Sequence, residues 1–98
     1  MDKLTEARAV INEADSLIRE QFEKRMQAVK EIAAWKKEKG LPVLDAAREK
    51  EVIEKNSEKL ADPSLAPYYV SFLESMMAVS RQFQQDILSE DQTGKSSL

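Results

Sequence analysis

The feature that most constrains the fold is an unbroken helix-compatible stretch from Leu4 to Lys37. It contains neither glycine nor proline, and its apolar residues recur at the three-and-four spacing of one helical face. These residues are Leu4, Ala7, Ile11, Ala14, Ile18, Val29 and Ile32. A helix of about 34 residues is ~50 Å long, well beyond the ~30 Å breadth of a small domain. We therefore predict that this helix projects from its own chain.

The projecting helix predicts a dimer. Its apolar stripe continues to the projecting end, and the same helix of a second copy offers the most economical surface for burying it. A chain of 98 residues has only a modest core of its own, so help from a partner is also favoured by size. We expect an intertwined homodimer.

The remaining chain divides into two further predicted helices. The sequence EKGLPVLD ends the first helix, and Asp45 is placed to cap a second that runs to about Leu60. A third begins near Pro67 after the turn ADPSLAP and continues to Leu88. With two glycines, three prolines and many strong helix formers, the chain is predicted to be all-α. Residues 1–90 form one domain, and the polar segment 91–98 is expected to be disordered.

Composition excludes several classes of function. The chain has no cysteine and no histidine, which removes disulfides, thiol nucleophiles, the usual zinc ligands and the commonest general base, so no metal site is expected. A net charge of −3 argues against a nucleic-acid partner. No apolar run approaches the ~20 residues that span a bilayer, and the first residues lack the apolar core of a signal peptide. We expect a soluble cytoplasmic protein without a membrane partner.

Two cations interrupt the buried stripe of the first helix. Arg25 lies seven residues from both Ile18 and Ile32, and Lys36 returns to nearly the same angle eleven residues after Arg25. Either side chain alone is most simply explained by a long stem that reaches solvent. Two on one stripe favour an inward orientation.

The other two helices also carry polar residues where a core is expected. The stripe of the third helix consists of Leu73, Met76, Ser80, Gln84 and Ile87. Taken singly, Ser80 could bond its own helix backbone and Gln84 could lie at a rim, while Glu49 could be a solvated carboxylate and Asp45 a cap. Taken together, Glu49, Ser80 and Gln84 with Arg25 and Lys36 predict a polar pocket inside a helical bundle, in which donors outnumber acceptors. The expected occupant is a small anion with carboxylates and a hydroxyl.

Arg8 cannot reach the pocket of its own chain. It lies seventeen residues before Arg25, which is ~25 Å along the helix and about 100° around it. It could reach the equivalent pocket of an antiparallel partner, which agrees with the predicted dimer. Alone, an arginine near a helix start is more often simply on the surface.

These residues resemble the all-helical class of chorismate mutases, the bacterial shikimate-pathway enzymes that convert chorismate to prephenate. The resemblance covers about residues 4 to 88 and is carried by ARAVINEAD, EKRMQAV, AAWKKEKGLPVLDAARE and AVSRQFQQ. It implies an interlocked dimer with two sites, each completed by Arg8 of the partner subunit. The reaction is pericyclic and needs no metal, cofactor or nucleophile.

The resemblance also implies roles for individual residues. Arg8 and Arg25 would bind the two substrate carboxylates, with help from Ser80. Lys36 and Gln84 would donate to the ether oxygen, and Glu49 would accept from the ring hydroxyl. Asp45 and Arg48 would shape that end of the site through backbone contacts and support of their neighbours.

Two other functions remain open on the sequence. An isochorismate-pyruvate lyase resembles this family in fold and keeps the cations, but has a different polar complement; the presence of both Glu49 and Ser80 favours the mutase. The second is a non-catalytic helical module that dimerises or binds an effector in the same pocket.

Overall fold

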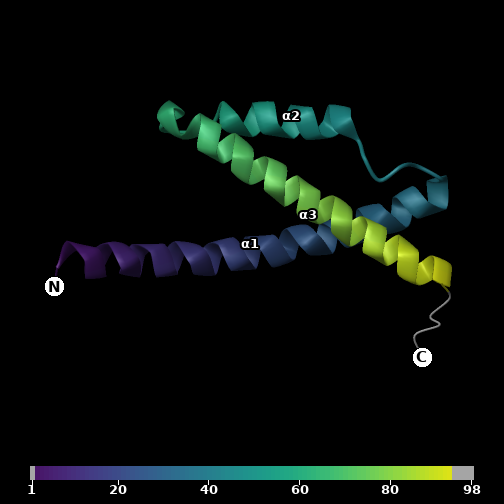
Figure 1. The fold of residues 1–98 in the computed structure, drawn as a ribbon, viewed down its shortest axis with the longest axis horizontal. Helices are drawn as coiled ribbons and strands as arrows, with labels where there is room; N and C mark the ends of the chain where they lie inside the picture. Colours follow the sequence, from purple (N-terminus) through teal and green to yellow (C-terminus); the bar gives the residue numbers. More distant parts are fainter. Residues whose placement is uncertain (1, 94–98) are drawn as a thin grey trace.

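The computed structural model describes residues 2–93, which form three α-helices and one short 3-10 helix (Figure 1). These are α1 (Lys3–Lys39), α2 (Ala46–Ser57), η1 (Pro63–Leu65) and α3 (Ala66–Thr93). This part of the chain contains no strand, and none of its helices has an apolar stretch that would cross a membrane. The prediction of an all-α chain with three helices, the first very long, is confirmed.

The helix boundaries differ most from prediction at the end of the chain. α3 continues to Thr93, past the predicted end at Leu88 and into the segment 91–98 that was expected to be disordered. Residues 94–98 lie outside the described residues. The second helix, α2, stops at Ser57, shortly before its predicted end at Leu60.

Local capping explains where α1 begins and ends. The Asp2 carboxylate accepts a hydrogen bond from the Thr5 backbone N–H at 2.8 Å, and this bond lowers the pKa of Asp2. At the far end Gly40 adopts a left-handed conformation, with φ of 68°, which lets its N–H bond to the last carbonyls of the helix. The Leu41 N–H also binds the Lys36 carbonyl at 2.8 Å. Gly40 thus turns the chain toward α2.

The core lies where α3 packs against the C-terminal half of α1 and against α2. Figure 1 shows α3 crossing α1 in this half, with α2 lying beside the first part of α3. The buried apolar side chains among the described residues are Val29, Ala33, Val43, Leu73 and Met77. No large side chain in this set is completely enclosed, so the core of one chain is thin.

The N-terminal half of α1 lies largely outside this core. The molecule is 55 Å along its longest axis, about the length of a 37-residue helix. Leu4, Ile11 and Ile18 are each more than half exposed, although their spacing predicts burial. An apolar groove of about 720 Å³ lies between α1 and α3, with Ile18, Phe22 and Phe72 in its wall. Within one chain, therefore, the predicted stripe is covered at Val29, whereas Ile32 near its C-terminal end is still 46% exposed.

Candidate active site

A polar cavity of about 400 Å³ lies between the C-terminal half of α1, the start of α2 and the middle of α3. Its wall includes seven of the eight residues predicted to form a site: Arg25, Lys36, Asp45, Arg48, Glu49, Ser80 and Gln84. Arg8 does not line it. The apolar parts of the wall come from Ala28, Val29, Ile32, Val43, Val52 and Met77. Three separate helices thus bring together the polar residues that interrupt their apolar stripes.

Arg25 points inward and is held by α3. Its Nη1 donates a hydrogen bond to Ser80 Oγ at 2.6 Å. Ser80 is 6% exposed, and its buried hydroxyl accepts this long-range bond. The sequence alone also allowed a bond from the hydroxyl to its own helix backbone. The guanidinium has five N–H donors and this contact uses one, which leaves the group able to bind an anion in the cavity.

Lys36 is anchored at the other end of the cavity. Its Nζ donates to the Val43 carbonyl oxygen at 2.6 Å, in the segment between α1 and α2. Val43 is itself buried, so the ammonium is drawn inward rather than out to solvent. An ammonium carries three donors, and this bond occupies one. The inward orientation predicted for both cations is the one observed.

Gln84 is a buried polar side chain with an unsatisfied hydrogen-bond acceptor. It is 6% exposed, and its Oε1 has no hydrogen-bond partner among the described residues. A buried acceptor without a partner costs about 1–3 kcal/mol. An acceptor of this kind requires a hydroxyl or N–H donor from a molecule in the cavity, whereas the NH2 group of the same amide can donate to an oxygen atom there.

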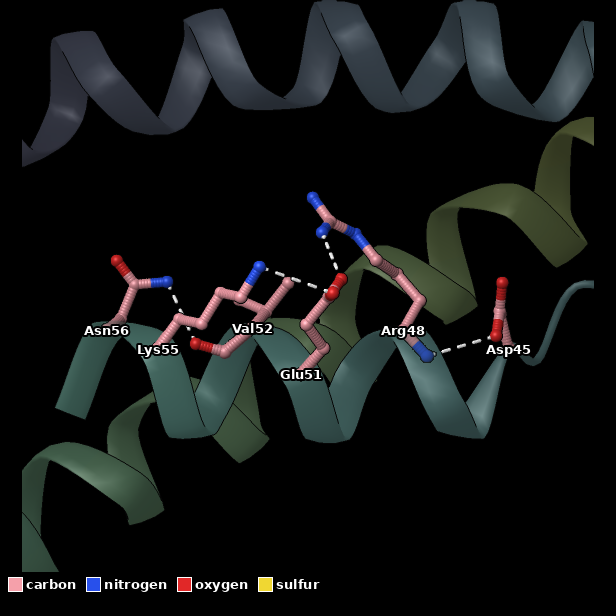
Figure 2. Close-up of polar contacts among 6 residues, drawn as sticks. All are labelled: Asp45, Arg48, Glu51, Val52, Lys55 and Asn56. Carbon is pink, nitrogen blue, oxygen red and sulfur yellow. Dashed lines mark hydrogen bonds and ion pairs between the residues drawn. The ribbon is translucent and has the colours of Figure 1, made fainter. Parts of the chain in front are cut away.

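Asp45 and Arg48 lie at the start of α2 and have local partners. Asp45 Oδ1 accepts from the Arg48 backbone N–H at 3.0 Å, the capping role that its position predicts. Figure 2 shows that the Arg48 side chain turns along α2, where Nη1 binds Glu51 Oε1 at 2.8 Å, and that Lys55 Nζ lies 3.3 Å from Oε2 of the same carboxylate. The hydrogen bond from Arg48 and then that from Lys55 lower the pKa of Glu51. In this conformation the Arg48 guanidinium lies on the surface of α2, bound to Glu51.

Glu49 has a partner that the sequence analysis did not single out. Arg81 Nη1 donates to Glu49 Oε1 at 2.5 Å, joining α3 to α2, and Arg81 also lines the cavity. A signal for it existed, because Met77, Arg81 and Gln84 follow each other at spacings of four and three on α3. The pairing with a residue 32 positions away could not be read from that spacing.

The cavity carries an excess of positive charge. Arg25, Lys36 and Arg81 contribute three cations, and Asp45 and Glu49 contribute two carboxylates, while the Arg48 guanidinium is paired with Glu51 on the surface of α2, so the formal balance is one positive charge. The wall also holds a hydroxyl and an amide but no cysteine or histidine, since the chain has none. Such a wall can bind and orient a small dianion, and it offers donors to an oxygen atom inside the cavity.

Comparison with known families agrees with this arrangement. The family described as chorismate mutase type II matches residues 7–85. The chain belongs to this family. No curated protein sequence gives a significant match to the chain.

The match to the type II chorismate mutase family includes the whole candidate site. It begins one residue before Arg8 and ends one residue after Gln84, so it spans every residue predicted for the site. It also spans the exposed half of α1, which contributes nothing to the cavity of its own chain. Most of the exposed half of α1 is therefore part of the region that matches the family.

Proposed function

We propose that the chain is a chorismate mutase that rearranges chorismate to prephenate in the biosynthesis of phenylalanine and tyrosine. The observation that carries the proposal is the single cavity lined by Arg25, Lys36, Glu49, Ser80 and Gln84, in a chain that belongs to the type II family. The substrate is a dianion with a ring hydroxyl and an ether oxygen. Its negative charges suit a cavity wall whose formal balance is positive.

The reaction requires little of the protein chemically. In a Claisen rearrangement the ether C–O bond breaks while a new C–C bond forms, and no proton or electron passes to the protein. A site without histidine or cysteine is therefore sufficient. The protein accelerates the step by holding the flexible dianion in its reactive chair-like conformer and by directing donors at the oxygen on which negative charge develops.

The proposed roles are those that the family resemblance implies, and the cavity brings the side chains for them together. Arg25 binds one carboxylate, and its bond to Ser80 holds the guanidinium across the cavity. Lys36 uses its remaining donors, and Gln84 its amide, to bind the ether oxygen. Glu49 accepts from the ring hydroxyl. These assignments use donors and acceptors that the fold leaves available.

Asp45 and Arg48 close the end of the cavity at the start of α2. The Asp45 cap fixes the first turn of α2, which carries both Arg48 and Glu49 into the wall. We assign these two residues to shaping the site through backbone and neighbour contacts, because the Arg48 guanidinium is bound to Glu51.

We further propose that the active form is an intertwined homodimer, in which Arg8 of the partner subunit binds the second carboxylate. Two features support it: the exposed apolar residues along the N-terminal half of α1, and the apolar groove beside them. A second copy of α1 would bury both. The cytoplasmic location stays a prediction.

A direct assay tests the proposal. The purified chain is incubated with chorismate, and the loss of chorismate absorbance is followed while the product is identified. We expect prephenate, formed many orders of magnitude faster than in buffer. A parallel incubation with isochorismate tests for salicylate, which would instead indicate a lyase. No acceleration with either substrate would leave the non-catalytic binding module.

A further inference from the structure

The pair formed by Arg81 and Glu49 separates two hollows of the protein. Both side chains line the polar cavity, and both also line an outer groove of about 530 Å³ between α2 and α3 that contains Lys50, Glu54 and Glu74. The Glu49 side chain is 25% exposed and that of Arg81 is 35% exposed. The pair is therefore part of the wall between cavity and solvent.

The contact engages only one carboxylate oxygen. Arg81 Nη1 binds Glu49 Oε1, and a carboxylate has a second oxygen with acceptor sites of its own. α2 has no fully buried residue, so little packing fixes the orientation of a side chain on it. α3 is more firmly packed, because it buries Leu73 and Met77. A bond from α3 therefore holds the Glu49 carboxylate in one orientation.

We propose that Arg81 is a positioning residue that holds Glu49 so that its second oxygen accepts the hydrogen bond from the ring hydroxyl of chorismate. This role rests on the proposed mutase function. Arg81 acts through Glu49 and does not bind a substrate carboxylate. A solvent-accessible ion pair of this kind adds at most about 1 kcal/mol to folding, so its main consequence is orientation rather than stability.

The test compares two substrates on the same variants. Arg81→Met removes the bond, Arg81→Lys keeps the charge, and Lys50→Met is the control, since it removes a neighbouring cation of the outer groove that does not line the cavity. With chorismate we expect kcat/KM to fall roughly tenfold in Arg81→Met, as for other directly coupled pairs, and less in Arg81→Lys. Lys50→Met should match the parent.

The second substrate is a chorismate analogue in which hydrogen replaces the ring hydroxyl. Glu49 then has nothing to accept from, so Arg81→Met and the parent should turn over the analogue at similar rates. Glu49→Gln should behave in the same way: a loss with chorismate and little loss with the analogue. Equal losses of Arg81→Met on both substrates would overturn the positioning role and point to a contact with a carboxylate or to a purely structural bond.

Urea unfolding of each variant separates structure from positioning. If Arg81→Met does not fold, Arg81→Lys carries the same two-substrate comparison, and equal losses on both substrates overturn the role there too. A parent chain that turns over neither compound overturns the proposed function and this role with it. Turnover by the parent with equal losses in the variant overturns the role of Arg81 alone.

Discussion

The two halves of α1 are equally helical but differ in what covers them. In residues 3–22 the apolar side chains lie open, with Ile11 55% exposed. In residues 25–39 Val29 is 6% and Ala33 only 1% exposed, and Arg25 and Lys36 are bonded to Ser80 and Val43 respectively. One half has an apolar surface without cover, and the other is covered on the side that lines the polar cavity, although Ile32 and Trp35 remain exposed.

The difference teaches that helix formation and burial are separate consequences of the sequence. The periodic pattern and the good helix formers continue through both halves, so both become helix. Burial depends on whether another element lies alongside, and α3 crosses α1 only at its C-terminal half (Figure 1). The open half is thus the part of α1 that we propose a second chain covers, and the covered half is the part that builds the cavity.

The largest effect is expected from a charge on the open half. Ile11→Asp should abolish the dimer, because an ionised carboxylate would replace apolar burial at a cost of roughly 3 kcal/mol or more per subunit. Sedimentation at low micromolar concentration and circular dichroism measure the outcome. Asn12→Asp, which adds the same charge at the adjacent position, is the control and should remain dimeric. A folded, active monomer from Ile11→Asp would contradict the role given to this half.

Loss of either arginine, one from each half, should nearly abolish activity. Arg8→Ala and Arg25→Ala should each be almost inactive as homodimers, since each site would lack a carboxylate partner. Mixed by refolding, they should recover activity, because one site of the heterodimer then contains both lesions and the other contains neither. Lys24→Ala, which removes the cation beside Arg25, is the control for charge alone. If heterodimers form without activity, Arg8 acts within its own chain and the two halves do not share a site.

Substitutions of Gln84 on α3 test the cavity that the covered half of α1 lines. Gln84→Ala should mainly lower kcat, since removing one preorganised donor of this kind typically costs ~3 to 4 kcal/mol. Gln84→Glu should work best in acid and lose activity as the pH rises, because only the protonated acid can donate to the ether oxygen. The parent should not lose activity over the same range. Coincident pH profiles, with the dimer intact, would remove Gln84 from the ether-oxygen contact.

The smallest effect is expected at the end of the covered half. Gly40 has φ of 68°, and a Cβ added there would meet no atom within 4 Å, so Gly40→Ala carries only the backbone cost of about 1–2 kcal/mol. Urea unfolding should detect this loss, with activity nearly unchanged. Gly40→Asn is the matched control and should lose less, since asparagine tolerates the left-handed conformation. Equal losses would mean that the left-handed conformation is not what limits substitution.

Much of the candidate site was predictable because its residues interrupt regular patterns. Arg25, Lys36, Ser80 and Gln84 fall on stripes that are otherwise apolar, and a polar residue at such a position must meet another polar group. Arg81 was missed because it lies beside its stripe and becomes informative only next to Glu49. The Val43 carbonyl that holds Lys36 has no signal in the sequence at all, since every residue has one.

The sequence by itself determined the three helices, their caps and the faces that would be polar, because helical periodicity and capping act over a few neighbouring residues. Asp45 and Gly40 are examples, since the first caps α2 and the second ends α1, as their positions predict. Only the tertiary structure decided which polar residues meet, as with Arg25 and Ser80 across 55 positions. It also decided where α1 is left uncovered, because that depends on the angle at which α3 crosses it, and no local pattern encodes that angle.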